Sequence, residues 1–118
     1  MRPTILVVDD EHSITDSLVA ILNQNGFDAR GAYNGEDAAE DARELCPDIL
    51  LTDVVMPKLD GIQLAVAVRE SCPATRIVLI SGQAATADYL ERARAQGHQF
   101  EFLPKPIHPE ELLRCLRG

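Results

Sequence analysis

The chain has 118 residues, of which 46% are hydrophobic and 25% charged, a composition typical of one globular domain. Its 11 Lys and Arg residues against 19 Asp and Glu residues give a net charge of −8, which argues against direct binding to nucleic acid or to anionic lipid. No apolar run approaches the ~20 residues of a membrane span, and the first residues lack the apolar core of a signal peptide. We therefore predict a single domain over residues 1–118, located in the cytoplasm.

The cysteines give no metal-binding or redox motif. Cys46, Cys72 and Cys115 are separated by 25 and 42 intervening residues, and no CxxC pair or His-Cys cluster accompanies them. We predict reduced and mostly buried thiols, with a redox role as the alternative. The three histidines are also far apart in the sequence, and we assign them no chemistry.

Short apolar runs alternate with stretches of helical spacing, and the runs begin near residues 4, 27, 48, 76 and 100. This period predicts five strand–helix units. The segments 5–8, 49–51 and 77–80 are continuously apolar, as in strands covered on both faces, whereas 27–31 and 100–102 alternate and suit sheet edges. Right-handed crossovers then give a doubly wound α/β fold with a parallel five-stranded sheet of order 2-1-3-4-5.

Capping residues and prolines mark the predicted helix starts. A capping box is predicted for residues 13–16, and Asp60 with Gln63 should form another, while Asn34 should cap the second helix. A fourth helix is expected near residues 85–95, and the last helix should have Pro109 in its first turn.

Three carboxylates follow strands that are neighbours in this topology. Asp9 and Asp10 follow the first strand and Asp53 follows the third, so all three should meet at the point where the chain reverses its winding direction. Carboxylates ~4 Å apart repel each other by roughly 4 kcal/mol at an effective dielectric of ~20, so such a cluster requires a bound proton or a cation. Oxygen ligands without nearby His or Cys favour Mg²⁺.

Two further polar groups are expected at the same edge of the sheet. Ser81 follows the fourth strand and Lys105 follows the fifth. Three aspartates, Mg²⁺ and Lys105 sum to zero charge, which suits the transfer of a phosphoryl group to a carboxylate. Asp53 is the most central aspartate and is therefore the predicted nucleophile.

The segments LVVDDE, LLTDVVMPKLDG, LISG and FLPKP resemble, in this order and spacing, the receiver domain of two-component response regulators. The resemblance covers the whole chain and implies a flavodoxin-like fold. It implies that a histidine kinase or a phosphotransfer protein donates a phosphoryl group to Asp53 in a Mg²⁺-dependent reaction, that the surface then switches, and that hydrolysis resets it. The domain would thus catalyse only its own phosphorylation and dephosphorylation.

The resemblance also implies roles for individual residues. Mg²⁺ would be bound by Asp10, Asp53 and the main-chain carbonyl of Val55, with Asp9 helping through water. Lys105 would pair with the phosphoryl group, Ser81 would report phosphorylation, and the aromatic switch would be Phe102. On sequence alone, Phe102 is more readily a core residue of an edge strand than a switch, and only the resemblance makes the two interpretations about equal. The Lys105–Pro106 bond resembles a cis peptide bond of the family.

Partners and alternative functions follow from the same residues. A downstream protein or a second copy of the chain could bind the face formed by the helix near 85–95, the last strand and the last helix. An alternative function is a Mg²⁺-dependent phosphohydrolase that acts through an aspartyl phosphate. Flavin binding is a third class, although the acidic segment DDEHS would repel the cofactor phosphate.

Overall fold

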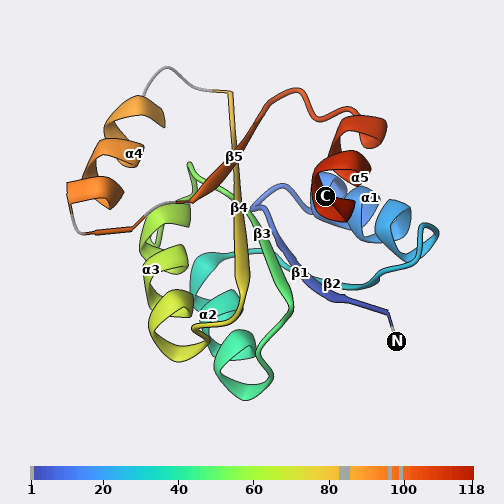
Figure 1. Ribbon diagram of the computed structural model, residues 1–118, viewed down its shortest axis with the longest axis horizontal. Helices are drawn as coiled ribbons and strands as arrows, with labels where there is room; N and C mark the ends of the chain where they lie inside the picture. The colour runs from blue at the N-terminus through green and yellow to red at the C-terminus, as the bar shows by residue number, and fades with distance from the viewer. Residues whose placement is uncertain (1, 83–85, 96, 99) are drawn as a thin grey trace.

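A computed structural model describes residues 2–82, 86–95, 97–98 and 100–118, and strands alternate with helices along them. The strands are β1 (Thr4–Val8), β2 (Asp28–Ala32), β3 (Ile49–Asp53), β4 (Arg76–Ser81) and β5 (Glu101–Pro104). The helices are α1 (His12–Asn23), α2 (Gly35–Glu44), α3 (Gly61–Ser71), α4 (Thr86–Ala95) and α5 (Pro109–Arg117). All strand pairs are parallel and their order is β2-β1-β3-β4-β5, which confirms the predicted fold (Figure 1).

Helices cover both faces of the sheet, with α1 and α5 on one side and α2, α3 and α4 on the other (Figure 1). Side chains of β1 alternate between two hydrophobic cores: Ile5 and Val7 pack with α1 and α5, whereas Leu6 and Val8 pack with α2 and α3. Because both faces are buried, the interior strands have continuous apolar runs.

The two cores are built from side chains of different size. On one side, α1 and α5 contribute the buried leucines Leu18, Leu22, Leu112 and Leu116. On the other side, α2 contributes Ala38 and Ala42, which have no exposed surface. Only small side chains therefore separate α2 from the sheet.

The edge strands are β2 and β5, as predicted, and each begins one residue later than the predicted segment. Phe27 and Phe100 lie one residue before β2 and β5, which begin at Asp28 and Glu101.

None of the helices in the described part of the chain combines the length and the hydropathy that crossing a bilayer requires.

Several predicted helix caps are confirmed. The Asn34 side chain accepts a hydrogen bond from the main-chain N–H of Asp37 at 2.7 Å. Asp60 and Gln63 form a complete capping box, with bonds of 2.9 and 3.0 Å. Pro109 is in the first turn of α5. These local signals therefore place three helix starts correctly.

The capping box predicted for residues 13–16 is wrong. Helix α1 begins earlier, at His12, and its N-cap is Glu11, whose side chain makes no capping hydrogen bond. The carboxylate of Asp9 instead accepts a bond from the main-chain N–H of Glu11 at 3.0 Å. Because the helix starts so soon after β1, Ser13 lies inside its first turn and cannot act as the cap.

The prediction of reduced, mostly buried cysteines is wrong for two of them. Cys46 and Cys72 form a disulfide with their Cα atoms 5.7 Å apart, and Cys46 is exposed. Each cysteine lies between the end of a helix and the start of the next strand, and those strands, β3 and β4, are neighbours in the sheet. The fold thus brings together residues that are distant in sequence. Cys115 is a free, half-buried thiol.

Candidate functional site at the carboxyl ends of the strands

The three predicted carboxylates lie together at the carboxyl ends of β1 and β3. Asp9, Asp10 and Asp53 each offer an oxygen atom, and these atoms all lie within 4.8 Å of one another. Asp9 and Asp53 are only 2% and 6% exposed, whereas Asp10 is exposed to solvent. We call these three residues the acidic cluster.

Hydrogen bonds fix Asp9 at the start of the cluster. Its main-chain N–H donates to the carbonyl of Ala32 at the end of β2, at 3.4 Å. Its carboxylate accepts from the N–H of Glu11, and its carbonyl accepts from the hydroxyl of Thr15 at 2.8 Å. The main chain and the side chain of Asp9 are therefore both held before any ligand binds.

Asp53 is the last residue of β3, and a close contact with α3 fixes the chain after it. The N–H of Val54 donates to the main-chain carbonyl of Ile80, and the N–H of Gly61 donates to the main-chain carbonyl of Val54 at 2.8 Å. A Cβ atom at Gly61 would lie 2.2 Å from the carbonyl oxygen of Asp53, so only glycine fits here. The start of α3 thus packs directly against the end of β3.

Lys105 follows β5 and reaches across to the acidic cluster. Its Nζ atom donates to Oδ2 of Asp53 at 3.1 Å and lies 3.8 Å from Oδ2 of Asp9. Its main-chain N–H donates to the carbonyl of Ser81, and the Lys105–Pro106 bond is cis, as the sequence motif implies. The ammonium group is therefore directed at the two buried carboxylates.

The electrostatics of the site are unbalanced, because three carboxylates face one ammonium group. Burial and the neighbouring carboxylates of Asp53 and Asp10 raise the pKa of Asp9, despite the hydrogen bond from Glu11. Burial lowers the pKa of Lys105, but its hydrogen bond and attraction to Asp53, together with Asp9 and Glu11, outweigh this and raise it. Hard oxygen donors with excess negative charge suit a divalent cation such as Mg²⁺.

The other predicted site residues lie around this cluster. Ser81 ends β4 and is 3% exposed, next to β5 in the sheet. Val55 lies two residues after Asp53 in the loop to α3, and the residue is 43% exposed. Phe102 lies on β5 opposite Leu79, and the residue is 39% exposed rather than packed in the core. The expectation that Phe102 is a core residue is therefore wrong for this conformation.

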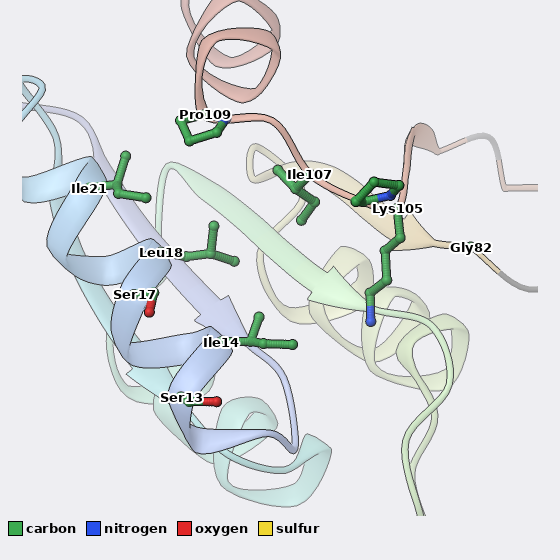
Figure 2. Close-up of a pocket in the computed structure, with 10 residues that line it drawn as sticks. Ser13, Ile14, Ser17, Leu18, Ile21, Gly82, Lys105, Ile107 and Pro109 are labelled. Carbon is green, nitrogen blue, oxygen red and sulfur yellow. The ribbon is translucent and has the colours of Figure 1, made fainter.

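An open groove runs from Lys105 along α1, with a volume of about 670 Å³. Figure 2 shows Ile14 and Leu18 of α1 directed toward Ile107, which lies in the segment between Lys105 and α5. We call this the α1–α5 groove. It is mostly apolar and is lined by Ser13, Ile14, Ser17, Leu18, Ile21, Gly82, Lys105, Pro106, Ile107 and Pro109.

Two residues that shape the site were not identified from the sequence. Gly61 is needed because α3 begins against β3, and Thr15 binds the carbonyl of Asp9 from within α1. The only sequence signal for Thr15 is a hydroxyl residue beside the apolar stripe of a helix, which is too common to indicate a site.

Known proteins match this sequence and this architecture. Residues 5–117 match the family model of the response regulator receiver domain. The response regulator MprA of Mycobacterium ulcerans and the DNA-binding response regulator MtrA of Mycobacterium tuberculosis are each 32% identical over the whole chain. The chain spans about half the length of these relatives, since it covers 50% of each.

Solved structures give the same result. The chemotaxis protein CheY4 of Vibrio cholerae superposes with a TM-score of 0.87 at 28% identity, covering 99% of this chain and 98% of that one. A response regulator receiver domain protein from Clostridium thermocellum also has a TM-score of 0.87, at 26% identity, covering 98% of this chain and 91% of that one. These similarities extend over nearly the whole fold.

Proposed function

Because this chain belongs to the response regulator receiver domain family, we propose that Asp53 accepts a phosphoryl group from the phosphohistidine of a histidine kinase or a phosphotransfer protein. The observation that carries this proposal is the placement of Asp53, which is buried in the acidic cluster and bonded to Lys105 at 3.1 Å. A carboxylate oxygen of Asp53 attacks phosphorus, the phosphorus–nitrogen bond breaks, and the imidazole leaves with the electron pair. Later attack by water releases phosphate and restores the carboxylate.

The acidic cluster is the proposed Mg²⁺ site of this reaction. Asp10, Asp53 and the main-chain carbonyl of Val55 would bind the ion, and Asp9 would help through water. The cluster fits this ion because its oxygens lie within 4.8 Å of one another and no histidine or cysteine joins it among the described residues. When bound, Mg²⁺ neutralises charge on the transferring phosphoryl group.

Lys105 and Ser81 are the proposed groups that respond to phosphorylation. The phosphoryl group adds a charge of about −1.5 to −2, which attracts the Lys105 ammonium group and the Ser81 hydroxyl. Movement of Ser81 then leaves space for Phe102, which is exposed in this structure. This inward movement would change the surface formed by α4, β5 and α5, where we propose that a downstream protein or a second copy binds.

The α1–α5 groove is the proposed contact for the phosphoryl donor. Lys105 lines one end of the groove and also bonds Asp53, so a protein that places its phosphohistidine over Asp53 would cover this surface.

The absence of direct nucleic-acid binding remains a prediction from the charge of −8. The domain limits 1–118 and the cytoplasmic location also remain predictions.

Acetyl phosphate with Mg²⁺ tests the acceptor assignment, and intact mass spectrometry reads the result. The wild type should gain one phosphoryl group, and Asp53→Asn should gain none. Asp28→Asn is the matched control, because Asp28 is exposed at the start of β2, away from the acidic cluster. Undiminished incorporation into Asp53→Asn would contradict the proposal. Repeated turnover of small phosphoesters would favour the phosphohydrolase, which the family match does not support.

A further inference from the structure

Thr15 is a polar residue of α1 with no exposed surface, and its hydroxyl points out of the helix toward the end of β1. The Oγ1 atom donates to the carbonyl oxygen of Asp9 at 2.8 Å. That oxygen belongs to the peptide group that joins Asp9 to Asp10. The bond therefore sets the orientation of the peptide between two members of the acidic cluster.

A missing side chain on β2 leaves the space in which Thr15 can make this bond. A Cβ atom at Gly31 would lie 2.6 Å from Cγ2 of Thr15. The Cγ2 and Oγ1 atoms are both attached to the Cβ of Thr15, so a rotation that relieves this contact also moves the hydroxyl. Gly31 and Thr15 therefore fit together, and the carbonyl of Asp9 depends on both.

Repulsion within the acidic cluster gives this restraint a purpose. Before a cation binds, Asp9, Asp10 and Asp53 repel one another, and a loosely held loop would let the Asp10 carboxylate move away from the other two. Ligands that are already in position bind a cation more tightly, because less ordering is needed on binding.

We propose that Thr15 is a positioning residue for the Mg²⁺ site, and that Gly31 is glycine because any side chain there would displace the Thr15 hydroxyl. The inference rests on the proposed function, since it concerns the same cation. Thr15 itself does not contact the ion. It acts through the peptide group between Asp9 and Asp10.

A Mg²⁺ titration followed by amide NMR shifts tests this without any phosphorylation. Thr15→Val keeps the shape of the side chain and removes the hydroxyl, and it should raise the Mg²⁺ dissociation constant about threefold to tenfold, the effect of one hydrogen bond. Thr15→Ser keeps the hydroxyl and should bind nearly as tightly as the wild type. Gly31→Ala should weaken binding in the same way as Thr15→Val.

Thr75→Val is the matched control. Thr75 is also buried, and its hydroxyl donates to the carbonyl of Pro47 at 2.6 Å, before β3 and far from the acidic cluster in the fold. The loss of that bond should lower the free energy of unfolding, measured in urea, without changing Mg²⁺ affinity. An equal loss of affinity in both valine variants would show general loosening and overturn the proposal.

Two other outcomes separate this inference from the proposed function. Wild-type affinity in Thr15→Val and in Gly31→Ala would overturn the positioning role alone. A wild type that binds no Mg²⁺ would overturn the proposed function and this inference with it. If Thr15→Val does not fold, the comparison of Gly31→Ala with Thr15→Ser decides the question. Both variants keep a side-chain hydroxyl at position 15, but only Gly31→Ala should displace it and weaken Mg²⁺ binding.

Discussion

The two ends of the sheet use polar residues in opposite ways. At the carboxyl ends of the strands, the acidic cluster gathers like charges around one lysine. At the amino ends, polar groups meet matching partners: the main-chain N–H and hydroxyl of Thr4 both donate to the carboxylate of Asp48, at 2.8 and 3.2 Å. The disulfide also lies at this end.

Arg76 completes the contrast at the amino end. Its guanidinium group makes two bonds of 2.6 Å to Glu101 on the neighbouring strand, and it also donates to the carbonyls of Cys115 and Leu116 in α5. Charge is paired here and crowded at the other end. The paired charges at the amino ends therefore stabilise the fold. The carboxylates at the carboxyl ends repel one another, and a bound cation would relieve that repulsion.

Loss of the disulfide at the amino ends of the strands should cause the largest change in the free energy of unfolding. Cys46→Ser opens a loop with a sequence separation of 26, and it should lower the free energy of unfolding by about 2–4 kcal/mol. Urea unfolding measures this, and a reductant should have the same effect on the wild type. Cys115→Ser is the control, because that thiol is free. Mg²⁺ affinity should not change in Cys46→Ser; a change would show that the two ends are coupled.

Removal of one carboxylate from the acidic cluster should stabilise the protein when no cation is present. Asp10→Asn relieves repulsion at an exposed position, so in chelator it should raise the free energy of unfolding by about 1 kcal/mol. Mg²⁺ should raise the melting temperature of the wild type, and this increase should largely disappear in Asp10→Asn. Asp28→Asn should show neither effect. A less stable Asp10→Asn in chelator would contradict the view that the cluster is strained by charge.

A lower pH should change the contributions of the two ends to the free energy of unfolding in opposite directions. Because the pKa of Asp9 is raised, its ionised form destabilises the fold at neutral pH. This destabilisation disappears as the pH falls toward 3.8, the ordinary pKa of an aspartate. The pKa of Glu101 is lowered by its bond to Arg76, so its stabilisation is complete above 4.5 and is lost as the pH falls through the folded-state pKa.

Unfolding measured against pH in two variants checks this. Relative to Asp9→Asn, the wild type should become more stable as the pH is lowered from neutrality. Relative to Glu101→Gln, it should lose its advantage below 4.5. The same sign in both comparisons would remove the distinction between the ends.

The sequence predicted the architecture because burial on both sides leaves continuous apolar strands, and the strand order then brings Asp9, Asp53 and Lys105 to one edge. The disulfide was missed because Cys46 and Cys72 become neighbours only when β3 and β4 pair. Their equivalent positions before adjacent strands were the available signal.

Thr15 was missed for a related reason. Its role depends on the rotation of α1 about its axis and on the close approach of β2 at Gly31, and neither is fixed by hydrophobic spacing. The start of α1 was misplaced because the bond from Glu11 to the carboxylate of Asp9 is set by the end of the preceding strand. Contacts between elements, rather than propensities within them, decide these details.

The alanines of α2 have a consequence for which substitutions the protein can accept. Ala38 and Ala42 have no exposed surface and no side-chain atoms beyond Cβ, so a larger residue at either position could fit only if the helix moved outward. The leucines of α1 and α5 can be shortened, at the cost of a cavity, without any such shift. Sequence variation should therefore be limited by overcrowding beneath α2 and by loss of volume beneath α1 and α5.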